Sequence, residues 1–566
     1  MRRSYRSPAR RPTGRPKATR ADTIAPPAPG IELTEPDCPT LSTLAAGYVG
    51  GLAARLLDGA DRDLVAPYTL ARPGRPERLP RRLVDRSALA RGLEVANSSF
   101  GHPRARELAA RLADPETAVV VTGQQTGLFG GPLLALVKAA SAARWAEAIE
   151  SSGRPAVAVF WMATEDHDFR EAGEARFLDA DGVFSLSLGE DSRPLAPIGL
   201  RTVGAEVEGL LAELRRRHPS EWFLRWTGRL GTFWRPEARF GDAYARTHLA
   251  LLGERAPLYL DSMLPELKAA EGPHLAALVD RRAELDSALA RREAEIARRG
   301  LPLQVAPQPG ASPLFLVRGG ERRRVEWRAG DRWSLRGADG DAPLAELVET
   351  IADNPAAVSP GVLARPAIQD AVLAPALFLV GPGEMAYLAQ AGAASEILGL
   401  PAPALSLRCF ALVLDARSRE HLDQLDATLE ELVARPGEIE SRLAVRAGGG
   451  FVAPLRDELL ARLGALRAPA LELDAHLEKP YEKTCEAVAR ALDAFGHRVE
   501  SAAARRDELS ADRLAGLHRL VTPDGGSQER VLSTSYFAGR WGEGFGARLL
   551  DALDLDPGRI SLVDPG

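Results

Sequence analysis

A cluster of acidic residues with one histidine follows directly on an apolar run that is typical of a buried strand. The run AVAVFWMA covers 156–163, and after it come Thr164, Glu165, Asp166, His167 and Asp168. Carboxylate and imidazole groups in such a place can act as general acid or base, bind an amine, or hold Mg²⁺ for a nucleotide. Three consecutive residues cannot all face one ion, so we expect no permanent metal site. The alternative is a solvated turn whose carboxylates cap a helix.

A glycine-rich loop precedes this cluster. Val119, Val120 and Val121 predict a buried strand, and the sequence after them reads TGQQTGLFGGP. Glycines let the backbone approach a ligand, and a helix start favours an anion, so we predict a site for phosphate or another anion. Its candidate binding residues are Thr122, Gly123, Gln124, Gln125, Gly127, Gly130 and Gly131. A turn without a ligand is the alternative, because this is neither a Walker loop nor a clean GxGxxG fingerprint.

The helix after this loop carries a lysine that is a candidate catalytic residue. Pro132 suits a first helical turn, and an apolar face runs from Leu133 to about Glu150. The chain has only 5 lysines among 72 basic residues, so Lys138, about two turns from the loop, is expected to serve as a compact ammonium. An ordinary surface lysine is the alternative.

These segments together predict a parallel α/β sheet. Strand, helix and strand form a βαβ unit, so the glycine loop and the acidic cluster emerge at the same carboxyl edge, where open sheets bind ligands. Leu258 to Asp261 and Ala404 to Leu407 are two lesser strands, each ending at or just before a charged residue. With a strand in 374–380, they predict a sheet of about five strands.

A third group of candidate residues flanks the strand in 374–380. Arg365, Pro366, Gln369 and Asp370 precede that strand, and a glycine turn and a helix start follow it. We predict that Arg365, Gln369, Gly381, Gly383 and Glu384 bind or position a substrate, with Glu384 at the helix N-terminus. For the two glycines, plain turn chemistry is an equal alternative.

The remaining segments predict insertions and a helical C-terminal part. Residues 265–299 look helical and 314–333 β-like, which indicates an insertion of the core at about 265–345. Long charged helical patterns cover 417–433, 454–471 and 478–520, without a strict heptad. They predict a helical hairpin that can also pair subunits. The segment 528–542, with Tyr536, Phe537 and Trp541, is expected to return to the core or to cap it.

Composition sets the broad class. The 566 residues carry a net charge of −5 and no basic surplus that would attract nucleic acid, which weakens a tRNA-binding interpretation. Cys38, Cys409 and Cys485 are too few and too widely spaced for a disulfide framework, which fits a reducing cytoplasm. Since no apolar run approaches about 18 residues, we expect no membrane span. The first 34 residues, basic and without an apolar signal core, are expected to be a disordered tail.

Several of these motifs, in this order, resemble the BshC family, the cysteine-adding enzymes or cysteine ligases of bacillithiol biosynthesis. They are TGQQTGLFGGP with Lys138, FWMATEDHDF, RPAIQDAVLAPALFLVGPGEMAY and the late SQERVL. The resemblance implies a Rossmann-like core related to nucleotidylyl transferases and class I aminoacyl-tRNA synthetases, interrupted by insertions, and a coiled coil that pairs subunits into a homodimer. The expected domains are 35–410 for the core, 411–525 for the coiled coil and 526–566 for a segment that returns to the core.

The activity that the resemblance implies is addition of cysteine to the amine of glucosaminyl malate. ATP with Mg²⁺ is a possible co-substrate, and we expect no tightly bound cofactor. The HxGH signature of the wider superfamily is absent, and Gln124 and Gln125 occupy the equivalent loop. We expect this loop and Lys138 to bind the anionic groups of the substrates. We expect Asp166, His167 or Asp168 to orient the amine or to remove its proton. The alternatives are a nucleotidylyl transferase acting on a small molecule and a non-catalytic coiled-coil scaffold.

Overall fold

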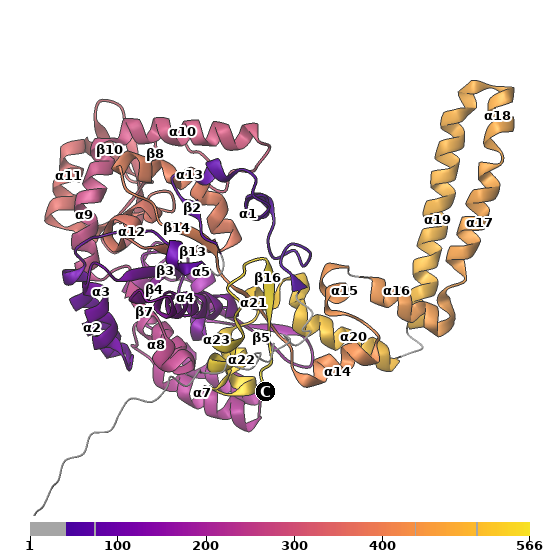
Figure 1. Cartoon of the computed structure of the whole chain (residues 1–566), viewed down its shortest axis with the longest axis horizontal. Coiled ribbons are helices and arrows are strands. Elements are labelled where there is room, and N and C mark those ends of the chain that lie inside the picture. Colours follow the sequence, from indigo (N-terminus) through magenta and orange to yellow (C-terminus); the bar gives the residue numbers. More distant parts are fainter. Residues whose placement is uncertain (1–40, 73–74, 436, 505–507) are drawn as a thin grey trace, which may run out of the picture. The chain divides into compact units, whose positions relative to one another are not determined.

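A six-stranded parallel sheet is the centre of the computed structural model (Figure 1), which describes residues 41–72, 75–435, 437–504 and 508–566. The tail predicted over residues 1–34 lies outside the described residues. The strand order is β2-β14-β13-β3-β4-β7, and every neighbouring pair is parallel. The strands are β2 (Thr69–Leu70), β3 (Ala118–Gln124), β4 (Ala156–Met162), β7 (Leu258–Asp261), β13 (Leu377–Val380) and β14 (Ala404–Leu407). The predicted parallel α/β sheet is confirmed, with the short edge strand β2 in addition.

Helices cover both faces of this sheet, because its strands are apolar on both faces. Val119 and Val121 of β3 pack in one core cluster, whereas Val120 between them packs in another. The first face lies against α2 (Ser87–Phe100), α3 (Ala105–Ala113) and α13 (Pro382–Leu398), and the second against α4 (Leu133–Ser151). Helix α4 is the one predicted after the glycine loop, although Pro132 is its N-cap rather than its first helical residue.

An insertion that the sequence did not predict lies between β4 and β7. It comprises α5 (Phe169–Ala172), the antiparallel pair β5 (Glu174–Leu178) and β6 (Val183–Ser187), α6 (Glu206–Arg217), α7 (Glu221–Phe233) and α8 (Phe240–Leu252). Aromatic side chains fill its core, among them Phe177, Trp226 and Trp234. Helix α8 also packs on the glycine loop after β3.

The second insertion follows β7 and has the predicted order of helices and then strands. Helices α9 (Pro265–Asp280) and α10 (Arg282–Arg298) precede a five-stranded sheet of order β11-β10-β9-β8-β12. Its elements are β8 (Ala311–Arg318), β9 (Glu321–Arg328), β10 (Arg332–Leu335), β11 (Ala342–Pro343), α11 (Leu344–Asp353) and β12 (Val358–Pro360). The sheet therefore runs beyond residue 345 to Pro360. Helix α12 (Arg365–Leu373) then leads into β13.

The C-terminal part is mainly helical, as predicted. The helices are α14 (Ala416–Gln424), α15 (Leu429–Ala434), α16 (Glu438–Ala444), α17 (Val452–Gly464), α18 (Arg467–Leu473), α19 (Glu478–Ala504) and α20 (Glu508–Val521). Helix α17 packs along α19 and forms a hairpin with it (Figure 1). The pattern predicted as one helix over 417–433 is divided between α14 and α15, because Asp426 adopts a left-handed conformation between them.

The last segment returns to the core. Helices α21 (Gln528–Val531) and α22 (Thr534–Trp541) contact α4, and α23 (Phe545–Ala552) precedes β16 (Arg559–Val563). Strand β16 pairs with β1 (Leu41–Ser42) and β15 (Phe410–Val413) in a three-stranded sheet. Helix α1 (Gly51–Leu57) packs on α13. Among the described helices, none is both long and apolar enough to cross a membrane.

Candidate active site

The residues that follow four neighbouring strands line one pocket at the carboxyl edge of the large sheet. We call this cavity of about 370 Å³ the sheet-edge pocket. Gln125 follows β3, Asp166 lies after β4, Gly381 follows β13 and Arg408 follows β14. The prediction that the glycine loop and the acidic cluster meet at one edge is therefore confirmed, and the segment after β13 lies at the same edge. Open α/β sheets bind their ligands at this edge.

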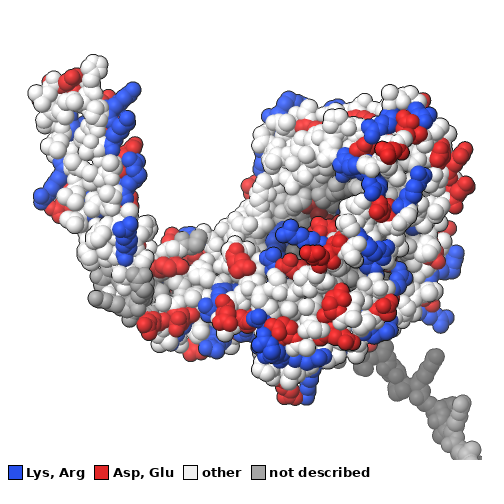
Figure 2. Space-filling view, turned by 180° about the vertical axis from the view of Figure 1, so that it is seen from behind, with Lys and Arg blue, Asp and Glu red and all other residues white. Residues whose placement is uncertain are grey.

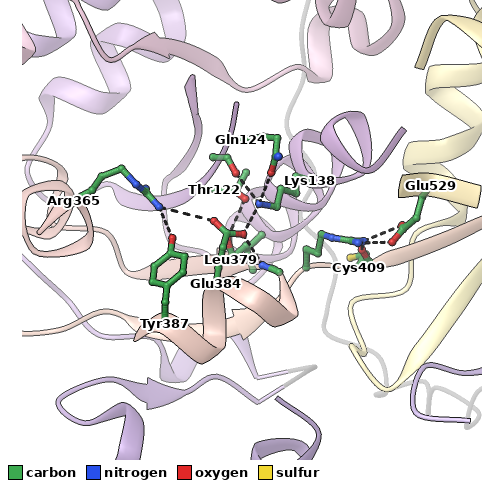
Figure 3. A network of polar contacts seen from close by, with 12 residues as sticks. Thr122, Gln124, Lys138, Arg365, Leu379, Glu384, Tyr387, Cys409 and Glu529 are labelled. Carbon is green, nitrogen blue, oxygen red and sulfur yellow. Dashed lines mark hydrogen bonds and ion pairs between the residues drawn. The ribbon is translucent and has the colours of Figure 1, made fainter. Parts of the chain in front are cut away.

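Lys138 is buried and fully occupied by partners within the protein. Its Nζ donates to the carbonyl of Gly123 at 2.7 Å, to Oε1 of Gln124 at 3.0 Å and to Oε2 of Glu384 (Figure 3). An ammonium has three N–H groups, so these acceptors use them all. Burial lowers the pKa of Lys138, and Glu384 opposes that effect. In this arrangement Lys138 ties α4 to β3 and α13 and is not a free donor for an anion.

Glu384 and Arg365 form the adjoining part of this network. Oε2 of Glu384 accepts the backbone N–H of Gly381 at 2.7 Å, so this carboxylate caps the start of α13. Arg365 donates to the hydroxyl of Tyr387 at 2.6 Å (Figure 3) and to Oε1 of Gln369 at 3.4 Å. Glu384 thus binds both the N-terminus of α13 and the Lys138 ammonium. Arg365, at the start of α12, lines the sheet-edge pocket.

The acidic cluster after β4 divides among three cavities. Asp166 lines both the sheet-edge pocket and a neighbouring cavity of about 760 Å³, which we call the insertion pocket. His167 lines only the insertion pocket, and its pKa is lowered by burial and by Arg322. Asp168 lines a third cavity, and its carboxylate accepts the Glu171 N–H as the N-cap of α5. Asp166 is thus the member of the cluster placed between two binding spaces.

Glu165 lines the insertion pocket and is paired with a buried lysine. Lys268 of α9 contacts Glu165 and donates to Glu271 at 2.9 Å, and all three side chains are buried. The backbone N–H of Glu165 donates to the Ser262 hydroxyl at 3.0 Å. A buried lysine between two carboxylates fixes the position of Glu165, because leaving any of these charges unpaired would be costly.

The insertion pocket and the sheet-edge pocket form a continuous site. Both are lined by Trp161, Ala163, Asp166 and Arg365. The larger space extends between α10 and the sheet of the second insertion, where Arg322 donates to the Ser359 hydroxyl at 3.0 Å. Figure 2 shows a hollow in the core in which basic and acidic side chains gather. Two adjoining spaces with mixed charge suit a reaction between two polar substrates.

Two sequence matches cover most of the chain. Residues 74–409 match "Bacillithiol biosynthesis BshC, N-terminal Rossmann-like domain", and residues 411–563 match the C-terminal coiled-coil domain of the same family. The chain belongs to the BshC family. Its fold is accordingly a Rossmann-like core followed by a coiled-coil domain, as the sequence motifs implied.

Similar BshC proteins carry the name "Putative cysteine ligase BshC". One from Thermus thermophilus is 33% identical over 477 residues, which are 78% of this chain and 91% of that protein. One from Solibacter usitatus is 29% identical over 476 residues, 83% of this chain and 88% of the relative. One from Salinibacter ruber is 28% identical over 493 residues, with 85% and 89% covered. The similarity therefore extends over nearly the whole length of these relatives.

The predicted glycines fall into three groups in the structure. Gly123, Gly381 and Gly383 line the sheet-edge pocket. Gly127 and Gly130 line none of the pockets described here, and a Cβ on Gly130 would lie 2.9 Å from Thr247 of α8. These two glycines serve close packing of the loop rather than access to those pockets, and Gly131 lines the third cavity.

Two other predicted residues are internal. The hydroxyl of Thr122 donates to the Leu379 carbonyl at 2.9 Å, which ties β3 to β13 (Figure 3). Gln369 is buried, and among the described residues its side-chain nitrogen has no hydrogen-bond partner. Neither residue lines any of the three pockets of the site.

The structure adds site residues that sequence reasoning missed. Tyr387, Arg408, Arg530 and Glu171 all line the sheet-edge pocket. Arg408 was visible as a charged residue after a predicted strand, and Arg530 lies in the SQERVL motif. No group of three or more His, Cys, Asp or Glu side chains in the described ranges is arranged to hold a metal ion.

Proposed function

We propose that this BshC protein joins cysteine to the amine of glucosaminyl malate through an amide bond. The observation that carries the proposal is the pair of adjoining pockets that share Asp166 and Arg365 at the carboxyl edge of the sheet. Two spaces that meet at one carboxylate can hold a donor and an acceptor with their reacting atoms close together, which supplies much of the catalysis in such reactions. The names of the similar proteins support cysteine as the donor.

Amide formation from a carboxylate needs an activated acyl group, so we propose ATP with Mg²⁺ as co-substrate. The cysteine carboxylate oxygen would first attack a phosphorus of ATP, which displaces pyrophosphate if the α-phosphorus is attacked and ADP if the γ-phosphorus is attacked. The amine nitrogen would then attack the acyl carbon, forming the C–N bond as the bond from that carbon to the phosphate-bound oxygen breaks. The nitrogen loses one proton, and we assign that proton to Asp166 because its carboxylate borders both pockets.

The other predicted residues take positioning roles in this proposal. Arg365 and Glu384 line the sheet-edge pocket, and Lys138 holds Gln124 of β3 and Glu384 of α13 in place. Glu165, held by Lys268, shapes the insertion pocket. Because the Lys138 ammonium is saturated by internal acceptors, we assign stabilisation of developing negative charge to arginines of the pocket rather than to Lys138.

The test is mass spectrometry of the purified full chain incubated with cysteine, glucosaminyl malate and ATP with Mg²⁺, leaving out each component in turn. Product with the mass of bacillithiol that requires both cysteine and glucosaminyl malate is the expected result, and the ATP omission tests the activation step. Pyrophosphate release that does not depend on cysteine would instead favour a nucleotidylyl transferase. No turnover with intact ligand binding would favour a scaffold, and either of these results overturns the proposal.

We also propose that the coiled-coil domain pairs two subunits. Large apolar side chains on its helices are exposed in the single chain, among them Leu466, Leu473 and Phe495. Exposed apolar residues along a hairpin are typical of a helix–helix interface. Sedimentation equilibrium should give a dimer for the natural chain and a monomer for Leu473→Glu with Phe495→Glu, whereas a monomeric natural chain would contradict the proposal.

A further inference from the structure

Of the four basic side chains that line the sheet-edge pocket, three already have partners within the protein. Lys138 donates to three acceptors, Arg365 donates to Tyr387, and Arg408 is paired with Glu529. The fourth is Arg530, whose side chain makes no hydrogen bond or ion pair with any residue in the described part of the chain. Among the basic side chains of this pocket, Arg530 is therefore the one whose guanidinium has no partner within the described residues.

The residues before Arg530 hold its backbone in place. The side-chain amide of Gln528 accepts the Val413 N–H at 2.8 Å and donates to the Val413 carbonyl at 3.0 Å, so it pairs with β15 like a strand residue. Glu529 is bound to Arg408, and both Gln528 and Glu529 are fully buried. Two buried neighbours thus fix α21, and the exposed Arg530 side chain starts from a rigid position. A fixed starting point lowers the entropy that must be lost when the side chain binds a ligand.

Arg530 also lines a second cavity beside the sheet-edge pocket. This space of about 480 Å³ is the third cavity, lined by Asp168 and Gly131, which we now call the side pocket. It shares Gln124, Leu134, Glu171 and Arg530 with the sheet-edge pocket. Of the other two arginines in its wall, Arg176 is paired with Glu174 at 2.8 Å. Arg170 makes no side-chain hydrogen bond or ion pair within the described ranges. Within the described residues, two guanidinium groups without a protein partner therefore line one cavity that shares part of its wall with the sheet-edge pocket.

We propose that Arg530 binds an oxyanion of a substrate in the side pocket, at its junction with the sheet-edge pocket. A guanidinium is always charged and offers parallel N–H donors that match the two oxygens of a carboxylate or phosphate. The ligand class is a small molecule that carries phosphate or carboxylate groups. That the oxyanion belongs to a substrate of amide formation rests on the proposed function, whereas the anion site itself does not.

The site can be tested without turnover by isothermal titration calorimetry of the full chain with inorganic pyrophosphate and with malate. We expect at least one of them to bind, and Arg530→Ala to raise its Kd about tenfold or more, because it removes the charged hydrogen-bond donors that face the anion. Arg530→Lys should bind with an intermediate Kd, since it keeps the charge and loses the paired donors. Pyrophosphate binding would assign the site to a phosphate-bearing substrate, and malate binding to the carboxylates of the acceptor.

The matched control is Arg519→Ala on α20, which removes the same charge from an exposed position that lines none of these pockets. Its Kd should equal that of the natural chain. The inference is overturned if neither anion binds the natural chain at millimolar concentration, or if Arg530→Ala and Arg519→Ala bind equally well. Since binding is measured directly, absence of bacillithiol formation would contradict the proposed function but not the anion site at Arg530.

Discussion

Arg408 and Glu529 form a buried ion pair that joins the end of β14 to α21. Nη1 of Arg408 donates to Oε2 of Glu529 at 2.9 Å, Nη2 donates to Oε1, and the two side chains are 1% and 0% exposed (Figure 3). Arg408 lies in the part of the chain that matches the Rossmann-like domain, and Glu529 in the part that matches the coiled-coil domain. The pair thus fixes the C-terminal domain to the edge of the sheet where the candidate active site lies.

Removing one partner of this pair should be far more damaging than removing both. Glu529→Ala leaves the Arg408 guanidinium buried without its counter-charge, which typically costs about 3–5 kcal/mol in the free energy of unfolding. The double change Arg408→Met with Glu529→Leu should cost less than Glu529→Ala alone, because no charge stays buried. Urea unfolding followed by tryptophan fluorescence measures both. A Glu529→Ala protein as stable as the natural chain would show that the pair is not closed in solution.

His248 should make the stability of the core depend on pH. Its ring is fully buried in α8, Nε2 donates to the Gly130 carbonyl at 2.9 Å, and burial lowers its pKa to about 4. The imidazole is neutral in the folded chain, whereas in the unfolded chain it gains a proton around its ordinary pKa of about 6.5. The contribution of the neutral His248 to the free energy of unfolding is therefore complete above about pH 6.5 and is lost as the pH falls toward 4. The loss is about 3 kcal/mol, since one pKa unit corresponds to about 1.4 kcal/mol.

The comparison for this prediction is His248→Gln, which cannot gain a proton but can still donate to Gly130. Between about pH 6.5 and 4 the free energy of unfolding should fall less steeply for His248→Gln than for the natural chain. All other titrating groups are common to the two proteins, so their effects cancel in the difference between the two pH profiles. Parallel pH profiles would contradict a neutral, buried His248.

Gly130 and Gly383 should respond in opposite ways to replacement by alanine. Gly130 has a φ of 92°, and its added Cβ would lie 2.9 Å from Thr247, so Gly130→Ala should destabilise the fold by about 1–3 kcal/mol. Gly383 lies in the first turn of α13 with open space around a Cβ, and Gly383→Ala should be neutral or stabilise by up to about 1 kcal/mol. Thermal melting of the two variants checks this, and a stable Gly130→Ala protein would refute the packing role.

The central sheet could be predicted because its strands are apolar on both faces. The bounds of β7 and β14 agree with the predicted segments, and β3, β4 and β13 differ by a few residues at their ends. Strand β2 has only two residues and carries no periodic pattern. The first insertion was missed because β5 and β6 are short and mixed in polarity, and only tertiary contacts bring its aromatic residues together.

The position of the site at the edge of the sheet could be predicted from the sequence. The partners of its charged side chains could not. A lysine in an amphipathic helix is ordinarily a surface or ligand-binding residue, and nothing local reveals that Lys138 meets Glu384, 246 positions later. The same holds for Arg530: within the described residues its side chain has no partner, whereas the adjacent Gln528 and Glu529 are bound to distant ones. Strand order determines which loops meet, whereas partner choice among charged residues depends on the completed fold.

Asp166 is the residue on which the proposed chemistry depends most directly. If its carboxylate removes the proton of the attacking amine, Asp166→Asn should lower kcat for bacillithiol formation by about 100-fold or more. Asp168→Asn is the matched control, since it removes one negative charge two residues away and asparagine can still cap α5. Its kcat should stay within a few-fold of the natural value. Near-normal turnover of a folded Asp166→Asn protein, with a large loss in His167→Gln, would move the base to the histidine that faces the insertion pocket.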